Sequence, residues 1–464
     1  FIVYSIFRKE AFASFFYFLY VWSMKKLIFI LLLTIPFFGF GQGEWNNWYF
    51  GNKVGLDFNT NPPTTLTNSQ MDAGEGSSSI SDANGNLLFY SNGNHIWDNT
   101  HSIMQNGYSI NSYLLTTSTQ ACLIVKQPSS DSLYYVFAVS NMSPFAWADT
   151  NFGITYSIVD MSLNSGTGKV TAKGISLNYF PTSEKLCAVM HANGIDKWII
   201  THKVPTNEFS AFLLTANGIS SPVLSNSGTP LGSVSAGIGT AGVLKASPDG
   251  RRLALVNALA ENGPLEFIEL FSFDNSSGMV QTNFTSLTTY NAFTDTVFYG
   301  LSFSPNSNVL YAIAHIGDQF SGNSFLYVYD LSQEHITPTI VDLNCASLAD
   351  LQLAPDDKIY FKGCNYPNIS YISNTNDLQN FSTTGSGPVV SYSQSSYLRY
   401  GLPNIPSWAY GQQYVSVVNN FSKDLNKGIL KVVDVLGRET NPKSNTPIFY
   451  IYDDGTVEKK IIIE

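Results

Sequence analysis

The sequence predicts an all-β protein: a β-propeller followed by a small β module at the C-terminal end. Three observations indicate this fold class. A strand–turn–strand pattern recurs along residues 43–410, residues that favour turns are abundant, and charged residues are few. Several short strands that recur at a spacing of about 50 residues are typical of propeller blades, which stack radially so that each sheet covers its neighbours.

The composition favours strands and turns over helices. Of the 464 residues, 44% are hydrophobic, 14% are aromatic and only 12% are charged, and Asn, Ser, Thr and Gly fill the intervals between apolar runs. The net charge is −10 and no basic cluster occurs. Phosphate contacts require Lys and Arg in a patch, so a nucleic-acid partner is not expected.

Six polar turns recur at intervals of about 48 to 63 residues, and each is followed by a β-rich run. Asn84-Gly85 and Pro248-Asp249-Gly250 supply the backbone angles that tight turns require. The predicted turns are residues 82–86, 128–131, 192–196, 247–250, 304–307 and 354–357. Each turn with its flanking strands predicts one blade.

A seventh blade can be assembled from the two ends of this region. Residues 48–50 and 55–58 supply strands at the start, and residues 405–410 supply one at the finish. Such closure would pin the ring shut without a covalent bond. We therefore favour seven blades over six or eight, and over a pair of β-sandwiches, whose units would be nearer about 100 residues.

Residues 24–42 have the features of a secretory signal peptide. Met24 is followed by Lys25 and Lys26, and then by an apolar run of about 14 residues. This run is shorter than the roughly 20 residues of a membrane-spanning helix, so the mature chain is expected to have no stable membrane span. We interpret residues 1–23 as a translated upstream segment that is not structural; a tandem membrane anchor is the alternative.

The last 35 residues predict a small β module. Residues 430–435 alternate between apolar and polar side chains, and residues 448–452 form a second β-rich run. Asp454-Gly455 then leads into a third run over residues 456–463. An Asp-Gly pair between two β-rich runs is a strong hairpin signal.

This tail resembles the C-terminal sorting domain of proteins that Bacteroidetes export through the type IX secretion system. The residues that carry the resemblance are Gly437, Phe449, Tyr450, Gly455, Lys459, Lys460, Ile461 and Ile463. The resemblance implies that the type IX machinery is a partner, that the chain passes through the periplasm, and that it is secreted or held on the outer cell surface.

The region from residue 45 to residue 410 resembles the N-terminal propeller of large Bacteroidetes surface proteins. The matching segments are residues 47–52, 55–58, 79–82, 87–93, 96–98 and 401–403. This resemblance implies a fold and a location but no activity. The expected organisation is an upstream segment (1–23), a signal peptide (24–42), a β-propeller (43–410), a linker (411–429) and a sorting domain (430–464).

The chain has four cysteines, and export permits disulfides. Cys345 and Cys364 are the favoured pair because they are 19 residues apart in what read as neighbouring strands. Four cysteines allow three connectivities, and the sequence does not choose among them. No CxxC spacing occurs, so neither a zinc site nor a thioredoxin-like site is expected.

The sequence contains no recognised catalytic motif, such as GxSxG, a P-loop or HExxH. Residues 82–86 offer oxygen atoms as a calcium loop does but lack its terminal Glu, so a hairpin turn is favoured there. No cofactor is predicted, and a structural calcium ion elsewhere stays open. Five acidic residues fall in predicted loops and receive no role: Glu75, Asp149, Glu184, Glu261 and Asp318.

Aromatic residues in predicted loops are the better functional indication, because flat rings suit sugars or peptides; packing between blades is the alternative. They are Tyr108, Tyr113, Phe145, Trp147, Tyr179, Phe180, Tyr366, Tyr392, Tyr397 and Tyr400. Our leading hypothesis is a secreted or cell-surface binding protein whose ligand is a carbohydrate or a protein. The alternatives are a secreted hydrolase or lyase on the same scaffold, and a structural component of the cell surface or gliding layer.

Overall fold

A computed structural model describes two compact units of the chain, Phe1–Tyr414 and Val415–Glu464. In the first unit the described residues are 43–111, 117–139, 153–179, 181–232, 241–258, 267–288, 296–317, 322–345, 349–363, 367–390, 397 and 399–410. In the second unit they are 429–433, 438, 440, 447–452 and 457–461. Within this part of the chain, none of the helices has the length and hydropathy that crossing a bilayer requires.

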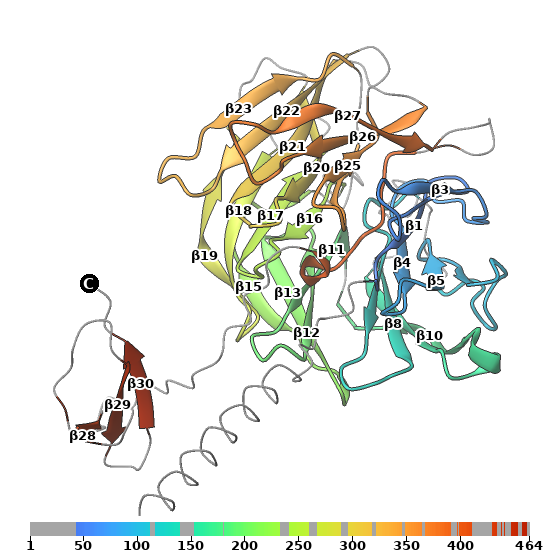
Figure 1. The fold of residues 1–464 in the computed structure, drawn as a ribbon. Helices are drawn as coiled ribbons and strands as arrows, with labels where there is room; N and C mark the ends of the chain where they lie inside the picture. Colours follow the sequence, from blue (N-terminus) through green and yellow to red (C-terminus); the bar gives the residue numbers. More distant parts are fainter. Residues whose placement is uncertain are drawn as a thin grey trace, which may run out of the picture. The chain divides into compact units, whose positions relative to one another are not determined.

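Seven antiparallel sheets make up the first unit and form the blades of a propeller (Figure 1). Blade 1 contains β1 (Asn47–Phe50), β2 (Val54–Asp57) and β3 (Thr64–Leu66). Blade 2 contains β4 (Ser78–Ser81), β5 (Leu87–Ser91) and β6 (Ile96–Asp98). Blade 3 contains β7 (Cys122–Lys126), β8 (Leu133–Val139), β9 (Ile154–Asp160) and β10 (Lys169–Ser176), with the short 3-10 helix η1 (Asn164–Gly166) between the last two.

Blade 4 contains β11 (Thr182–Met190), β12 (Lys197–Lys203) and β13 (Glu208–Thr215), and both β14 (Gly218–Ile219) and β15 (Val223–Asn226) pair with β13. Blade 5 contains β16 (Leu244–Ala246), β17 (Arg252–Asn257), β18 (Phe267–Asp274) and β19 (Met279–Ser286). Blade 6 contains β20 (Thr296–Phe303), β21 (Val309–Ile316), β22 (Asn323–Asp330) and β23 (Pro338–Asp342). Blade 7 contains β24 (Leu351–Leu353), β25 (Ile359–Phe361), β26 (Asn368–Ser373) and β27 (Ser382–Val389). The predicted fold class and the seven blades are confirmed.

All six predicted turns occupy the same place in successive blades, between the first strand and the second. Each contains a residue with positive φ, the backbone conformation that these turns require. These residues are Gly85, Ser129, Gly194, Gly250, Ser307 and Asp357. In the first turn, the Asp82 carboxylate accepts bonds from the backbone of Asn84 and Asn86, so its oxygens serve the hairpin, as the sequence favours.

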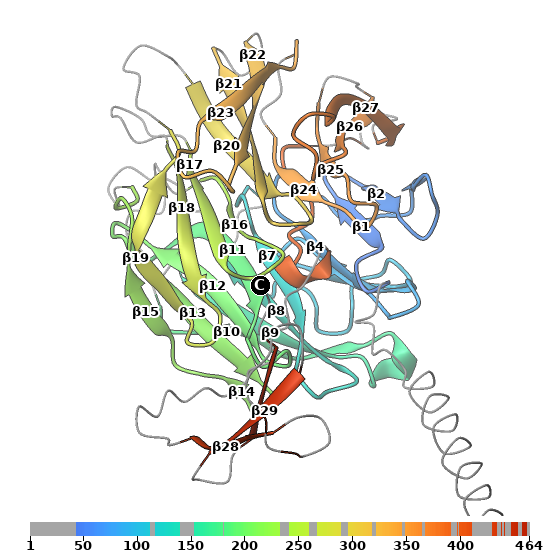
Figure 2. The same cartoon turned by 60° about the vertical axis from the view of Figure 1, so that its left-hand side comes forward.

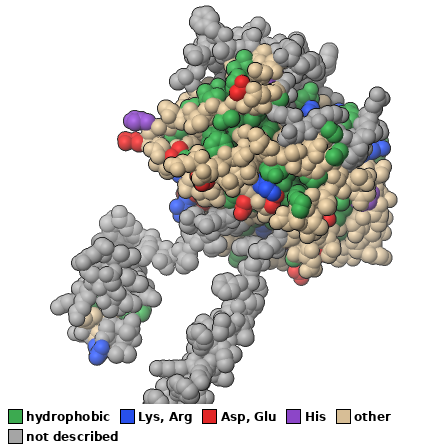
Figure 3. Space-filling model, turned by 45° about the horizontal axis from the view of Figure 1, so that its top comes forward, with side chains coloured by type: hydrophobic (Ala, Val, Ile, Leu, Met, Phe, Trp, Pro, Cys, Tyr) green, Lys and Arg blue, Asp and Glu red, His purple; other side chains and the backbone are tan. Residues whose placement is uncertain are grey.

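The two faces of the ring differ in their connections. We call the face with these six turns the turn face. The first strands of blades 2 to 7 begin at the opposite face, where the chain crosses to the next blade, and we call that face the loop face. These first strands contact one another around the axis, while outer strands such as β10 and β19 expose most of their residues (Figure 2). On the surface drawn in Figure 3, acidic and basic side chains lie scattered among uncharged groups.

The predicted strand over residues 405–410 is wrong. Pro406 interrupts this stretch, which instead contains the 3-10 helix η2 (Ser407–Ala409). Proline has no N–H to donate to a sheet ladder, so a regular strand cannot form here. We call residues 399–410 the return segment. Figure 1 shows η2 near the centre of the ring, beside β11.

All three strands of blade 1 therefore come from the N-terminal region, and this blade differs from the others. Its strand β1 runs antiparallel to β4: the Ser79 hydroxyl donates to the Asn47 carbonyl, and the Ser77 hydroxyl donates to the Tyr49 carbonyl. The first strands of the other blades run the opposite way, from the loop face to the turn face. The return segment takes the inner position that a first strand of blade 1 would have.

Aromatic packing closes the ring between blades 1 and 7. The ring of Tyr360 in β25 lies 6.0 Å from that of Trp48 and 5.4 Å from that of Phe58, both in near-perpendicular arrangements. Nearby, the Thr65 hydroxyl donates a 2.8 Å bond to the carbonyl of Val389 in β27. Packing, rather than a shared ladder, therefore holds the first and last blades together.

The second unit contains one antiparallel sheet, with the order β28 (Ile429–Val433), β29 (Pro447–Tyr452) and β30 (Val457–Ile461). These strands coincide with the three β-rich runs of the tail. Phe449 pairs with Val433 on one side and with Lys459 on the other. The predicted β module is confirmed as a structure, while its sorting role stays a prediction.

Candidate functional site

The return segment fills the central channel, and Asn404 anchors it. The Asn404 backbone N–H donates a 2.7 Å bond to Ser77, and its side-chain amide donates a 2.9 Å bond to the Leu186 carbonyl. The Ser78 hydroxyl donates to the Asn404 carbonyl at 3.0 Å, and Gln120 lies 3.5 Å from the Asn404 side-chain oxygen. One residue thus bonds to the inner strands or lead-in residues of blades 2, 3 and 4.

A buried ion pair crosses the channel between blades 5 and 7. The Lys245 ammonium lies 3.2 Å from an Asp350 carboxylate oxygen and 2.8 Å from the side-chain oxygen of Gln352. Burial raises the pKa of Asp350, although the Lys245 charge and hydrogen bonds act in the opposite direction. The cost of removing the two charged groups from water exceeds their mutual attraction, as is common for buried ion pairs. Loss of either partner would therefore leave the other as a buried group without its partner.

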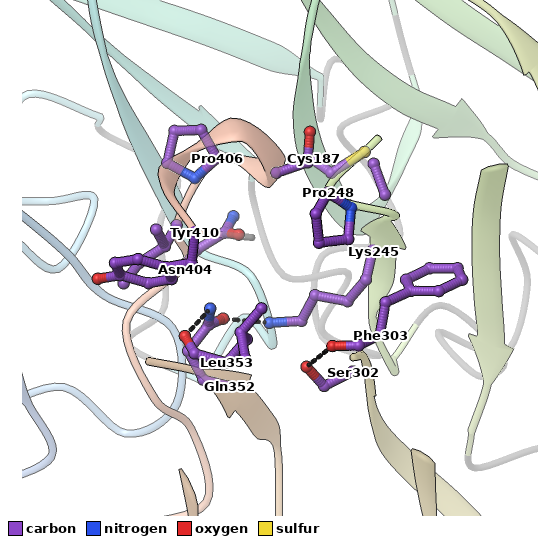
Figure 4. Close-up of a pocket in the computed structure, with 13 residues that line it drawn as sticks. Cys187, Lys245, Pro248, Ser302, Phe303, Gln352, Leu353, Asn404, Pro406 and Tyr410 are labelled. Atoms are coloured by element: carbon purple, nitrogen blue, oxygen red, sulfur yellow. Dashed lines mark hydrogen bonds between the residues drawn. The ribbon is translucent and has the colours of Figure 1, made fainter. Parts of the chain in front are cut away.

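A small pocket remains between the return segment and blades 4 to 7, where the first strands end near the turn face (Figure 4). Its lining includes Cys187, Lys245, Ser302, Gln352 and Tyr410, and its volume is about 30 Å³. A cavity of this size holds roughly one or two water molecules and is far too small for a sugar ring. The pocket is therefore part of a packed channel rather than a ligand site.

A polar cluster lies at the other end of the channel, at the loop face. The Tyr299 hydroxyl donates a 2.6 Å bond to a Glu75 carboxyl oxygen. The backbone N–H and the hydroxyl of Thr119 both donate 2.8 Å bonds to the Glu184 carboxylate. We call these four residues the mouth cluster. They come from blades 2, 3, 4 and 6: Glu75 and Thr119 precede first strands, while Glu184 and Tyr299 lie in the first half of β11 and β20.

Burial shifts the ionisation of this cluster. It raises the pKa of Glu75 to about 8; the nearby Glu184 charge also raises it, while hydrogen bonds from Tyr299 and Thr119 act in the other direction. Burial likewise raises the pKa of Tyr299, as does the Glu75 charge. Burial lowers the pKa of the adjacent Lys185 to about 7, opposed by the Glu184 charge. At neutral pH, Glu75 therefore carries its proton beside a second carboxyl group.

This arrangement supplies a proton donor and a hydrogen-bonded carboxylate in one place, the two roles that acid–base chemistry needs. Glu184 is almost fully buried and Glu75 is part-buried, so only Glu75 has partial access from the surface. Within the described ranges, no group of three or more His, Cys, Asp or Glu side chains could hold a metal ion.

The sequence pointed to Glu75 and Glu184 among loop acids without relating them to each other. Glu75 precedes β4, as expected, but Glu184 lies within β11, so its placement in a loop is wrong. The other three acids, Asp149, Glu261 and Asp318, lie outside the described residues. Tyr299 and Thr119 were missed. Thr119, like Glu75, lies three residues before a first strand, and this shared position could have identified it, whereas Tyr299 lies within β20 and has no such signal.

The aromatic residues divide between exposed and packed positions. Tyr108 is 64% exposed, with its ring centroid 4.5 Å from that of His95, whereas Tyr179 is buried and donates to Glu208. The Arg399 guanidinium lies 5.4 Å from the centroid of the Tyr397 ring, and the Lys362 ammonium lies 4.9 Å from that of Tyr400. The other predicted aromatics lie outside the described residues: Tyr113, Phe145, Trp147, Phe180, Tyr366 and Tyr392.

Among the residues of the predicted sorting signal, Phe449 and Tyr450 lie in β29, and Lys459, Lys460 and Ile461 lie in β30. Gly437, Gly455 and Ile463 are outside the part of the chain that the structure describes.

Two of the four cysteines, Cys122 and Cys187, are buried free thiols. Cys345 is disulfide-bonded and follows β23 in the connection to blade 7, not in a strand. Its predicted partner, Cys364, falls outside the described residues.

Solved structures with a similar fold share little sequence identity with this chain. No family model matches the chain, and no curated protein matches its sequence. A protein from Lactobacillus plantarum is 12% identical, with 77% of this chain and 98% of that chain covered and a TM-score of 0.47. The Dos1 propeller is 11% identical, with 75% and 82% covered and a TM-score of 0.41. An oligogalacturonate lyase in complex with manganese is 13% identical, with 69% and 81% covered and a TM-score of 0.36.

Proposed function

We propose that this protein is an exported binding propeller, presented outside the cell, whose ligand is a carbohydrate or a protein and contacts the loop face. The observation that carries this proposal is the occupied channel. The return segment, held by Asn404, fills the space where a small ligand could enter a propeller, and the pocket left over has a volume of only about 30 Å³. Recognition then falls to the outer surface.

The loop face offers more surface for recognition than the turn face. Its connections include residues 99–121 between blades 2 and 3 and residues 227–243 between blades 4 and 5, whereas the six turns of the opposite face span five or six residues each between their strands. Tyr108 is exposed in the first of these connections. Loops held by a rigid scaffold are common sites of binding.

Binding can be tested with the chain from residue 43 to residue 464, applied to immobilised polysaccharides with calcium or with a chelator. Retention on one polysaccharide class is expected, and Tyr108→Ala should weaken it because that side chain is exposed at the loop face. Ile195→Ala is the matched control, since Ile195 is 55% exposed in a turn of the opposite face. A structural role would be favoured if the protein binds no polysaccharide and no surface protein and is instead recovered as part of a surface assembly.

Export through the type IX machinery forms the second part of the proposal. It is supported by the signal-peptide features of residues 24–42 and by the resemblance of the tail to a sorting domain. Deletion of residues 430–464 should leave the protein folded but confined to the periplasm. Appending residues 411–464 to an unrelated periplasmic protein should send that protein to the surface. Surface display that survives the deletion would contradict this part.

A second candidate function is hydrolysis or elimination at the mouth cluster. The specific observation is the protonated Glu75 near Glu184, which could act as acid and base. Release of soluble product from a polysaccharide or peptide, abolished by Glu75→Gln, would support it. Wild-type release by that variant would exclude Glu75 as the acid.

A further inference from the structure

We propose that the mouth cluster is a proton-dependent clamp, which holds the return segment in the channel most tightly when Glu75 is protonated and releases a proton when it opens. The clamp is a property of ring closure. It goes beyond the proposed binding function and does not depend on it.

The geometry of the clamp joins blades that are not neighbours in the ring. The Tyr299 hydroxyl of blade 6 donates across the channel to the Glu75 carboxyl of blade 2 at 2.6 Å. Beside this contact, Thr119 of blade 3 donates to Glu184 of blade 4, and the Gly242 N–H of blade 5 lies 3.3 Å from the Thr119 hydroxyl. Five blades therefore meet at the mouth of the channel.

The return segment enters the channel against this cluster. Gly401 lies so close to Glu75 that a Cβ at Gly401 would fall 2.2 Å from the Glu75 carbonyl oxygen. The next contact outward is the Asp350 N–H, which donates a 3.0 Å bond to the Tyr400 carbonyl. Movement of residues 400–404 out of the channel would therefore separate Gly401 from the backbone of Glu75, the residue whose carboxyl group holds the bond to Tyr299.

The charges around Glu75 favour its neutral form. The described titratable groups that act on it are Glu184 from β11 and Tyr299 from β20. Lys185, next along β11, donates its ammonium proton to the Ala241 carbonyl at 2.8 Å, and its charge acts on Glu184. At the outer end of the return segment, Arg399 pairs with Asp72 at 3.1 Å. Ionisation of Glu75 would thus place two carboxylates at one buried mouth.

The direction of the pH effect follows from linkage. In the closed clamp the pKa of Glu75 is about 8, whereas in the open, hydrated state its pKa returns to the ordinary value of 4.5. Between these two values, opening releases one proton, so the opening equilibrium rises by up to about tenfold per pH unit. Above about pH 8 both states are ionised and no further weakening is expected.

Hydrogen exchange of the full mature chain tests the clamp directly. The backbone amides of the return segment, including Asn404 with its bond to Ser77, are followed from pH 5.5 to 9 and corrected for intrinsic exchange. Their protection should fall with pH up to about 8 and then level off. Amides of the strand pair β21–β22, in the middle of the blade 6 sheet, serve as the internal reference for global opening.

Glu75→Gln removes the titrating proton while keeping the shape of the neutral side chain. This variant should show no pH slope in the return segment, whereas Glu334→Gln, which alters an exposed acid between β22 and β23, should keep the wild-type slope. An unchanged slope in Glu75→Gln overturns the proposal. If Glu75→Gln does not fold, Tyr299→Phe decides. It should lower protection several-fold at every pH, and wild-type protection in that variant overturns the proposal equally.

Discussion

The hydroxyl group of Tyr410 donates a 2.7 Å hydrogen bond to the carbonyl oxygen of Trp45, 365 residues earlier in the chain. The same oxygen atom of Tyr410 accepts a 3.2 Å bond from the indole N–H of Trp48. Around this contact, the rings of Trp45 and Trp408 meet edge to face with centroids 6.5 Å apart. One buried hydroxyl thus ties the end of the return segment to the first strand of the ring.

Tyr410→Phe should destabilise the ring without changing its fold. The substitution leaves the Trp45 carbonyl and the Trp48 N–H without this partner in a buried place, at a cost of about 1–3 kcal/mol in the free energy of unfolding. Chemical denaturation should show a lower midpoint with an unchanged slope. Tyr108→Phe, at a side chain that is 64% exposed, is the control and should stay within about 0.5 kcal/mol of wild type.

Asn404→Ala should loosen the return segment more than any exposed Asn→Ala substitution. It removes the side-chain bond to the Leu186 carbonyl and the contact with Gln120, both fully buried, so a loss of about 1–3 kcal/mol is expected. Limited proteolysis should cut the chain near residue 404 faster in this variant. Asn84→Ala, in an exposed turn, provides the comparison, and equal cleavage of the two variants would contradict the anchoring role.

Lys245→Met should be strongly destabilising, because it leaves Asp350 buried beside Gln352 without its cation. Breaking a buried pair costs about 3–5 kcal/mol. The double variant Lys245→Met/Asp350→Asn should recover part of the loss, which a double-mutant cycle would measure. Lys203→Met breaks a more exposed 3.7 Å pair with Glu208 and should cost less than about 1 kcal/mol. A similar loss of unfolding free energy in Lys245→Met and Lys203→Met would show that burial does not determine how much an ion pair contributes to stability.

Acid should destabilise the ring through His202. Burial and the nearby charge of Lys185 lower the pKa of this histidine to about 3, although a hydrogen bond to the Lys203 backbone acts in the other direction. Between about pH 6.5 and 3 the unfolded chain binds a proton that the folded chain does not. Stability therefore falls as the pH drops through this window, by up to about 1.4 kcal/mol per pH unit.

His202→Asn should flatten that part of the pH profile, because the amide can donate to the Lys203 carbonyl as the ring nitrogen does without titrating. Thermal unfolding at pH 4, 5 and 6 provides the measurement. His335→Asn, at an exposed histidine, should leave the slope unchanged. A flattened slope in the exposed variant, or a wild-type slope in His202→Asn, would assign the acid sensitivity elsewhere.

The repeated turns could be predicted because their signal is local. Gly85, Gly194 and Gly250 stand where the backbone needs positive φ, and the β-rich runs beside them have no helical period. The β strands of the tail were predictable for the same reason. Where the chain departs from local rules, the prediction failed. Residues 405–410 read as an apolar strand, but Pro406 stops a ladder there and residues 407–409 form a 3-10 turn instead.

The mouth cluster could not be read from neighbouring residues. Glu75 and Tyr299 are 224 residues apart, and nothing near either one indicates the other. The sequence predicted a loop at Glu184 because its neighbours Ser183 and Lys185 are also polar. In the structure all three residues belong to β11 and are buried. Polar residues of an inner strand are stabilised by partners from other blades, so their local pattern resembles that of a solvated loop.

The sequence by itself determined the β class, the repeat, the position of the six turns and the strands of the tail, because short-range backbone preferences specify each of them. Tertiary structure alone decided how blade 1 is built, that the return segment fills the channel, and which polar groups meet at its mouth. These features depend on contacts such as Tyr410 with Trp45 and Lys245 with Asp350, whose partners come together only when the ring closes. Such contacts gain their strength from burial, and burial is a property of the assembled ring.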